Sequence, residues 1–471
     1  MIDVRERAVD RAPVAARGFL LLLVASIAMA HAWAFILYQL PDTTKHWSDQ
    51  DGYRRLGQVL AATGRFTRYP DATTFVPEVG RTPGYPAFVA AAYRLFGVSQ
   101  LAVAIPQAIV FGLLTFIVYL LVRRVGSERV AIASGLAVAL YAPIPYFAAL
   151  VMTELWTTFV LTVAVCLVIR ASQRGGTIDF VLAGAFLGYT ALCRPVFVLL
   201  PVGVAAVGAA TTRIGSRRPV APWAVLLGAA AVTCLPWFFY NYHYFHRVTI
   251  SPAGGIGRAT WEGSWQGTWS GRVQAGLTDI AERDDDRAML DRDVTSFAEA
   301  SGAAPGPMLT YVHQWQDIRR IWTTPIEPQE RARTRIEADR EYGRVGLQNI
   351  RVDPLGWLRR RIVRGVFTLW AADLPIRYSD INRTPTAIVR GIWLTVAAID
   401  LMAGVGLAVL VALGFAREAA LLATPLVYVT AVHFPLLTEA RQSLPTKPLV
   451  VALAVIAVAA LRGRLLRPRS L

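Results

Sequence analysis

The chain is 471 residues long, and 55% of its residues are hydrophobic while only 17% are charged. A soluble globular protein carries about 25% charged residues, so this composition excludes an ordinary soluble domain and predicts a membrane protein with several spans. The formal net charge of +16 does not by itself predict nucleic-acid binding, because the placement of charges matters more than their sum. The three cysteines lie in apolar runs without the spacing of a disulfide framework or a metal site.

The first apolar run, residues 18–40, follows a short basic stretch. It is long enough to cross a hydrocarbon core of roughly 30 Å, whereas the apolar part of a secretory signal peptide has about 7–15 residues. We therefore expect a retained transmembrane helix. Ala28-Met29-Ala30 is similar to a signal-peptidase site, so a cleaved signal is the alternative.

Nine further apolar runs follow along the chain. They cover residues 101–122, 129–148, 150–170, 178–193, 195–212, 221–240, 387–414, 418–437 and 446–464. Arginines gather in every second link, beginning with Arg123 and Arg124, and also in both tails. Cytoplasmic loops of membrane proteins are enriched in Lys and Arg, so this alternation predicts ten spans with both termini in the cytoplasm.

Two long segments then lie outside the membrane. Residues 41–100 begin with a stretch that places Tyr53, Leu56 and Leu60 on one face of an interfacial helix. Residues 241–386 contain charged, helix-like stretches. We expect an all-α polytopic fold in three parts. These are a seven-span module over residues 1–240, a mostly helical outer (periplasmic) domain over residues 241–386, and a three-span module over residues 387–471.

Polar residues from separate segments fall at the outer helix ends or in the outer loops of this topology. They are Asp49, Asp51, Arg81, Glu154, Arg194, Asn241, Glu439 and Arg441. Ionisable groups that gather at a membrane face often form a functional site, so we expect one at the outer surface. The plainer alternative is that outer loops are simply polar.

The stretch WSDQDG, residues 47–52, places two acids directly after the first apolar run. Ser48 and Asp51 fit a capping box, and acids at a helix N-terminus favour the helix dipole, which explains Asp51 well and Asp49 only partly. Capping is also the alternative for Glu154, which follows Thr153 at a predicted helix start. A local pair between Glu439 and Arg441 requires extended backbone, since residues two apart on a helix do not face each other.

Two further features allow more than one interpretation. Asp400 lies in the middle of the eighth predicted span, where a carboxylate is costly and usually functional. It is the best argument for a transporter, unless it is protonated or paired with another helix. Trp261, Trp265 and Trp269 could stack on sugar faces or anchor the chain at the membrane interface.

The run SDQDGYRRLGQVLAATGRF, followed by RTPGYPAFVAAAYRLFG, resembles the first outer loop of the GT-C membrane glycosyltransferases. The likeness is strongest to the branch that contains aminoarabinose-lipid A transferases and protein mannosyltransferases. In that branch an acid opens the loop, a tyrosine follows four residues later, and an R-T-P-x-Y-P string leads to the next span. Here these are Asp49, Tyr53 and residues 81–86. Further matches are Gln107, Glu154, Arg194-Pro195, Asn241 and EARQSLPTKP at residues 439–448, whereas Tyr240 and Gln442 depart from the pattern.

The resemblance implies an inverting enzyme that takes a sugar from a polyprenyl-phosphate donor and passes it to a lipid, protein or polysaccharide acceptor. The acceptor hydroxyl needs a carboxylate base, and the anionic leaving group needs cations rather than a general acid. The resemblance implies that Asp49, Asp51 and Glu154 are catalytic, and that Tyr53, Arg81, Tyr85, Arg194, Asn241 and Arg441 bind substrate. Asp49 is the preferred base and Arg441 the preferred phosphate ligand, because a guanidinium can donate two parallel hydrogen bonds to phosphate oxygens.

No cofactor is required by this scheme, although Asp49 and Asp51 could hold a divalent metal ion. The expected partners are the sugar donor, its acceptor and membrane lipids, and no nucleic acid. The arginine- and alanine-rich composition indicates a bacterial inner membrane, with the site facing the periplasm. The alternatives are a lipid or glycan transporter, and an outer-face glycan ligase or polymerase that uses a diphosphate-linked donor.

Overall fold

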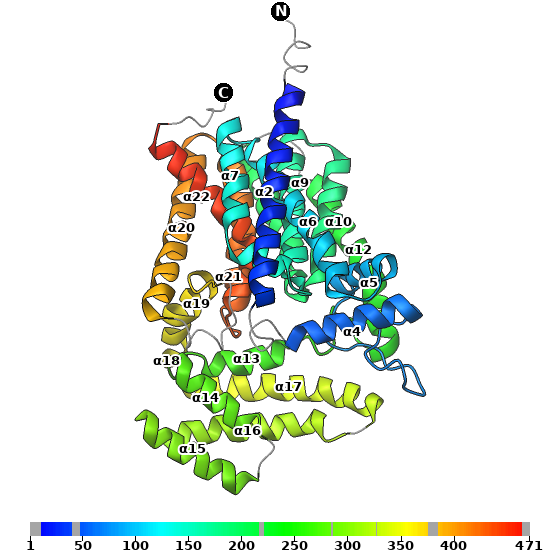
Figure 1. The fold of residues 1–471 in the computed structure, drawn as a ribbon, viewed down its shortest axis with the longest axis vertical. Coiled ribbons are helices and arrows are strands. Elements are labelled where there is room, and N and C mark those ends of the chain that lie inside the picture. The colour runs from blue at the N-terminus through cyan, green and yellow to red at the C-terminus, as the bar shows by residue number, and fades with distance from the viewer. Residues whose placement is uncertain are drawn as a thin grey trace, which may run out of the picture.

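The computed structural model describes residues 11–39, 48–215, 221–283, 286–325, 327–374 and 385–463, and every regular element in these ranges is a helix. A bundle of long helices stands above a layer of helices that crosses its lower end (Figure 1). The bundle and its flanking helices are α2 (Arg11–Gln39), α4 (Ser48–Thr63), α5 (Gly84–Phe96), α6 (Gln100–Val122), α7 (Glu128–Leu140), α8 (Pro143–Ala148), α9 (Thr153–Arg174), α10 (Thr177–Cys193), η1 (Pro195–Phe197), α11 (Leu200–Gly215), α12 (Ala221–Phe245), α20 (Thr386–Ala412), α21 (Ala416–His433), η4 (Ala440–Gln442), η5 (Leu444–Thr446) and α22 (Lys447–Leu461).

Seven helices in the described ranges are long and apolar enough to cross a membrane. They are Arg17–Ile36, Gln100–Val122, Thr153–Arg174, Pro195–Thr212, Ala221–Phe245, Thr386–Ala412 and Leu444–Leu461. The chain is therefore an integral membrane protein. The start of α2 and the end of α22 both lie at the end of the bundle opposite the lower layer (Figure 1), as a topology with both termini on one side requires.

The ten-span topology stays a prediction, because three of the expected spans are less clear. Thr177–Cys193 is apolar but short. Residues 129–148 form two helices, α7 and α8, since Tyr141 has extended backbone and Pro143 has no N–H to continue the helical ladder. The helix α21 contains Pro425 and has the acidic Glu418 in its first turn.

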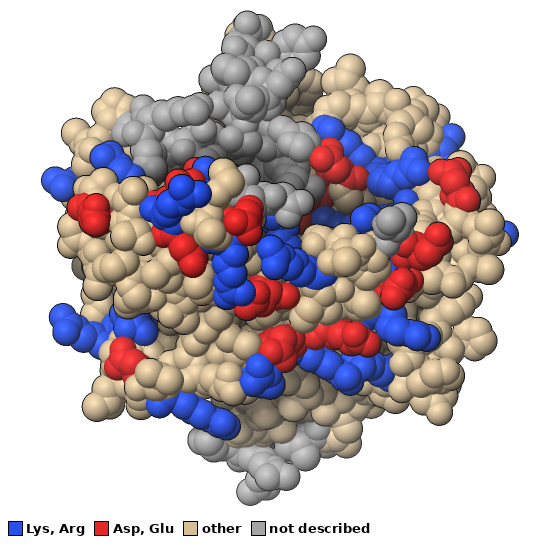
Figure 2. Space-filling model, turned by 90° about the horizontal axis from the view of Figure 1, so that it is seen from below, with Lys and Arg blue, Asp and Glu red and all other residues tan. Residues whose placement is uncertain are grey.

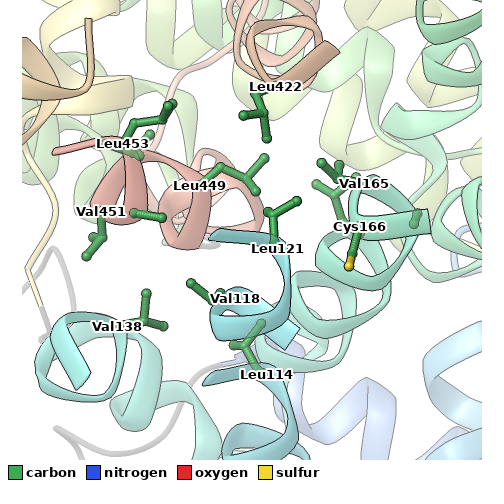
Figure 3. Close-up of a cluster of buried hydrophobic side chains, with 14 of the residues drawn as sticks. Leu114, Val118, Leu121, Val138, Val165, Cys166, Leu422, Leu449, Val451 and Leu453 are labelled. Atoms are coloured by element: carbon green, nitrogen blue, oxygen red, sulfur yellow. The ribbon is translucent and has the colours of Figure 1, made fainter. Parts of the chain in front are cut away.

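The interior of the bundle is a continuous hydrophobic core. Leu114, Val118 and Leu121 of α6 meet Val165 of α9 and Leu449 of α22 (Figure 3). Small residues bring other helix backbones close together. A Cβ on Gly184 of α10 would lie 2.1 Å from the carbonyl oxygen of Leu226, and one on Gly406 of α20 would lie 2.1 Å from that of Leu453.

Asp400 has its helix partner in the first residue of α22. The Lys447 Nζ donates to both carboxylate oxygens of Asp400, at 2.9 and 3.2 Å, and to the Trp370 carbonyl at 2.7 Å. Lys447 is fully buried. This pair explains the carboxylate in the eighth predicted span and removes the main argument for a transporter.

The lower layer contains α13 (Ile256–Trp265), α14 (Gly271–Ala281), α15 (Arg287–Ser301), α16 (Pro305–Thr323) and α17 (Pro328–Val352), and α18 (Pro354–Arg360), η2 (Arg361–Gly365) and α19 (Val366–Trp370) lead back to the bundle. We call α13–α17 the outer domain, after the side of the membrane that the sequence predicts for them. These helices share their own core, in which Trp261 is fully buried, with Trp265 and Trp269 packed against it. Trp261 is therefore a core residue, neither a sugar platform nor an interface anchor. Acidic and basic side chains lie side by side on the face seen from below (Figure 2).

Candidate active site

Asp49 lies in the first turn of α4, where the outer loop meets the end of the bundle. Its Oδ1 accepts a hydrogen bond from Arg81 Nη2 at 3.1 Å, and its Oδ2 accepts one from Arg441 Nη1 at 2.9 Å. Burial alone would raise the pKa of Asp49, but the charge of Arg441 and then that of Arg81 outweigh it, so the pKa lies below its usual value. The carboxylate is therefore ionised at neutral pH, with both oxygens engaged by guanidinium groups.

The position of Arg81 depends on the loop before it and on a glycine beside it. Glu78 accepts hydrogen bonds from the backbone N–H groups of Gly80 and Arg81 and is paired with Arg68, which fixes the turn. A Cβ on Gly52 would lie 2.2 Å from Arg81 Nη1 and 2.3 Å from Arg81 Cζ. Glycine at this position of α4 leaves room for the guanidinium to reach Asp49, and a Cβ there would displace it.

Tyr53 contacts this guanidinium, and Tyr85 packs against Tyr53. The Arg81 Cζ lies 4.7 Å from the centre of the Tyr53 ring, a distance typical of a cation–π contact. Tyr53 meets Tyr85 edge to face, with ring centres 5.1 Å apart. The Tyr85 hydroxyl donates to Gln107 Oε1 at 2.9 Å, and Gln107 Nε2 donates to the Leu150 carbonyl at 2.7 Å. Tyr85 is fully buried and acts here as a link between the outer loop and the bundle.

Arg441 lies in the short helix η4, between α21 and α22. Its Nε donates to Glu439 Oε2 at 2.8 Å, and its Nη1 lies 3.7 Å from Glu154 Oε1 as well as 2.9 Å from Asp49 Oδ2. The local pair with Glu439 forms because Glu439 has extended backbone, with φ −131° and ψ 146°. One guanidinium therefore contacts three carboxylates from three separate segments.

Glu154 is buried in the first turn of α9, with 1% of its side chain exposed. Its Oε1 lies 3.8 Å from Arg194 Nη2, and Arg194 Nη1 donates to the Arg441 carbonyl at 3.2 Å. The Glu154 Oε2 has no hydrogen-bond partner among the described residues. A buried acceptor without a donor is costly, so this oxygen is a point at which a substrate hydroxyl could donate.

Comparison with known proteins gives the fold that carries this cluster. Residues 80–240 match the family described as dolichyl-phosphate-mannose-protein mannosyltransferase. The oligosaccharyltransferase AglB from Archaeoglobus fulgidus, solved with an inhibitory peptide and a dolichol-phosphate, aligns over 95% of this chain with 12% identity and a TM-score of 0.52. This chain has a GT-C fold. The resemblance predicted from the sequence is thereby confirmed.

Two further solved structures align with most of this chain. The apo form of the A. fulgidus oligosaccharyltransferase aligns over 94% of this chain with 14% identity and a TM-score of 0.53. This chain spans 50% of the length of either oligosaccharyltransferase chain. ArnT from Cupriavidus metallidurans with bound undecaprenyl phosphate aligns over 94% of this chain and 78% of its own, at 16% identity, but its TM-score of 0.39 is too low to argue from. No match was found among curated protein sequences.

In this GT-C fold, Asp51 and Asn241 are placed differently from the other predicted site residues. Asp51 is exposed in the first turn of α4, where an acid favours the helix dipole. Asn241 is buried near the end of α12, and its Nδ2 donates to the carbonyls of Thr249 and Ile250 at 2.7 and 3.3 Å. These bonds make Asn241 a support for the chain that leads into the outer domain.

The carboxylates of this cluster contact arginine side chains. Within the described residues, no group of three or more His, Cys, Asp or Glu side chains is arranged to hold a metal ion.

One acid that the sequence did not single out joins the cluster. Glu262 of α13 lies near enough for the charges of Glu439 and Arg441 to act on its carboxyl group. Its signal in the sequence is that it is the only acid in the Gly/Trp-rich stretch 261–271.

Proposed function

We propose that this chain is an inverting glycosyltransferase that moves a sugar from a polyprenyl-phosphate donor to an acceptor hydroxyl at the outer face of a bacterial inner membrane. The observation that carries the proposal is a carboxylate, Asp49, held between Arg81 and Arg441 at the end of an apolar helix bundle. A base for the acceptor and cations for an anionic leaving group therefore lie within one hydrogen bond of each other. The dolichol-phosphate in complex with AglB belongs to the same class of lipid as the proposed donor.

The donor phosphate and Asp49 would compete for the same two guanidinium groups. In the free protein both carboxylate oxygens are engaged by Arg81 and Arg441. A phosphate that binds these arginines displaces Asp49, which raises the pKa of its carboxyl group and frees an oxygen to accept a proton. Donor binding would thus prepare the base before the acceptor reacts.

The reaction then needs one proton transfer and one displacement. Asp49 accepts the proton of the acceptor hydroxyl while that oxygen forms a bond to the anomeric carbon. The bond between the anomeric carbon and the phosphate oxygen breaks, and polyprenyl phosphate leaves with the bonding electron pair. Arg441 and Arg81 stabilise the charge of the leaving phosphate, and Arg194 holds the Arg441 backbone in place.

The remaining predicted residues take supporting roles in this proposal. The free Oε2 of Glu154 accepts a hydrogen bond from substrate, while its Oε1 faces Arg194 and Arg441. Tyr53 and Tyr85 keep Arg81 in position, Asp51 stabilises the start of α4, and Asn241 fixes the approach to the outer domain. If a divalent metal takes part, Asp49 and Asp51 are its nearest pair in sequence.

The proposed topology has ten spans, both termini in the cytoplasm, and residues 241–386 on the outer side of the membrane. Arginine-rich links alternating along the chain support it. A periplasm-active reporter fused after residue 300 should be active, and one fused after residue 215 should be inactive. The opposite pattern would move the cluster to the cytoplasmic face.

The function itself is tested by giving the purified protein a radiolabelled polyprenyl-phosphate sugar. Transfer of label to an acceptor is the expected result. Movement of the labelled lipid across a vesicle membrane without transfer would identify a transporter instead. A requirement for a diphosphate-linked donor would identify a ligase or polymerase.

A further inference from the structure

The outer domain reaches the active-site cluster through one face of α13. The backbone N–H of Leu437 donates to the Ala259 carbonyl at 2.6 Å, and a Cβ on Gly263 would lie 2.7 Å from that same nitrogen. The Gln266 Oε1 accepts from the Thr438 N–H at 2.9 Å. Positions 259, 263 and 266 therefore face the segment that leads directly into η4 and Arg441.

Glu262 lies on this same face of α13, since position 262 is three residues after 259 and four before 266. The pKa of its carboxyl group lies above its usual value, because burial and the charge of Glu439 together outweigh the opposite effects of Arg258 and Arg441. Its hydrogen-bond partner is Arg258, whose Nε lies 2.9 Å from Glu262 Oε1. The side chains of Glu262, Glu439 and Arg441 still keep 20%, 22% and 20% of their surface exposed, so all three can meet a ligand.

A purely structural explanation of Glu262 is that it holds Arg258 over the Trp315 ring, where the Arg258 Cζ lies 4.9 Å from the ring centre. That role does not require a second carboxylate nearby. Two carboxylates close together in a partly buried region repel each other, which is unfavourable, and such pairs are common at functional sites. The outer domain also contains an ordinary Glu–Arg pair, Glu341 with Arg344, which lies at the surface of α17.

We propose that Glu262 and Glu439 form a subsite that recognises the hydroxyl groups of the donor sugar, beside the phosphate-binding Arg441. This inference rests on the proposed function, because it takes Arg441 as the phosphate ligand. The sugar is joined directly to that phosphate, so its hydroxyls lie next to whichever groups flank Arg441. A carboxylate can accept hydrogen bonds through both of its oxygens, so Glu262 and Glu439 can each accept from neighbouring sugar hydroxyls. The membrane bundle then supplies the chemistry, while the outer domain contributes to the choice of sugar.

The test compares the binding of a polyprenyl-phosphate sugar with that of bare polyprenyl phosphate to purified Glu262→Gln protein. Because hydrogen bonds to a charged group contribute strongly to binding, the variant should bind the sugar-bearing lipid about 10-fold or more weakly than the wild type does. Bare polyprenyl phosphate should bind as it does to the wild type. Glu341→Gln is the matched control, and both lipids should bind it normally. Arg441→Ala should weaken the binding of both lipids.

Three outcomes would overturn the subsite: unchanged binding of both lipids by Glu262→Gln, equal weakening of both, or a wild type that binds the two lipids equally well. If Glu262→Gln does not fold by its thermal unfolding curve, Glu262→Asp replaces it. This variant keeps the charge but shortens its reach, and it should lose the preference for the sugar-bearing lipid. Failure of the wild type to bind bare polyprenyl phosphate would be different, since it would reject the proposed function itself.

Discussion

Gly52→Ala separates the function of Arg81 from the stability of the fold. The new methyl carbon would lie 2.2 Å from Arg81 Nη1, whereas ordinary contact begins at 3.4 Å, so the guanidinium must move by about 1.2 Å. That displacement breaks the 3.1 Å hydrogen bond to Asp49 and disturbs the position of Arg81 over Tyr53. A hydrogen bond to a charged group contributes about 1.5–3 kcal/mol, so we expect kcat/KM for the donor to fall roughly 10- to 100-fold.

The free energy of unfolding should change far less than the activity. Alanine is favoured over glycine inside a helix by about 1 kcal/mol, which offsets part of the lost contact with Asp49. Because the atoms that must move are the end of a long, flexible side chain, the backbone need not shift. The expected result is a folded protein that uses the donor poorly.

The assay measures kcat/KM for a polyprenyl-phosphate sugar and the thermal unfolding midpoint in one detergent preparation. Gly228→Ala is the matched control, since Gly228 lies inside α12 and a Cβ there meets no atom within 4 Å. It should gain stability and keep its activity. A Gly52→Ala protein with wild-type kcat/KM would refute the role given to Arg81.

Three other results are expected. Asp49→Asn should lower the transfer rate about 10²- to 10⁴-fold, and Asp51→Asn should have a much smaller effect; the reverse order would assign the base to Asp51. Burial raises the pKa of Asp49, but Arg441 and Arg81 outweigh burial and hold this pKa below its usual value, so Arg441→Ala should raise the pKa of Asp49. As the solution is acidified, the kcat/KM of this variant should therefore begin to fall at a higher pH than that of the wild type. If the acidic side of the kcat/KM–pH profile is the same in the variant and the wild type, Asp49 is not the titrating base. Lys447→Ala leaves Asp400 without its partner and should cost about 3–5 kcal/mol of stability, and a small change in the unfolding midpoint would contradict the importance of that buried pair.

Hydropathy predicted the membrane part of the fold well where a run is long and uninterrupted. The runs 101–122 and 221–240 coincide with α6 and most of α12. The run 129–148 was predicted as one span but forms two helices, because the proline at position 143 has no N–H for the backbone hydrogen bonds of a helix. Mean hydropathy over the run does not detect this interruption. Residues 241–386 were predicted to be mostly helical from their charged, helix-like stretches, and the described part of this range contains the helices α13–α19.

The candidate site was partly visible because several of its residues lie in local motifs. Asp49, Tyr53 and Arg81 fall in WSDQDG, the following helix and RTPGYP. The pairings could not be predicted, since the Asp49–Arg441 hydrogen bond joins residues 392 positions apart and the Lys447–Asp400 bond joins residues 47 apart. Such contacts depend on which helices meet at the end of the bundle. Glu262 was missed for the same reason, because it joins the cluster only when α13 packs against the segment before η4.

The central claim is that the cluster of Asp49, Arg81 and Arg441 transfers sugar from a polyprenyl-phosphate donor. The most direct measurement counts both products at once, using purified protein, a polyprenyl-phosphate sugar with label in the sugar and in the lipid, and acceptor membranes from cells that lack this protein. We predict that one molecule of polyprenyl phosphate is released for each sugar attached to acceptor, and that Asp49→Asn and Arg441→Ala lower both products together, each by about 10²-fold or more. Sugar transfer that continues at the wild-type rate in both variants, or lipid phosphate release without any glycosylated acceptor, would contradict the claim.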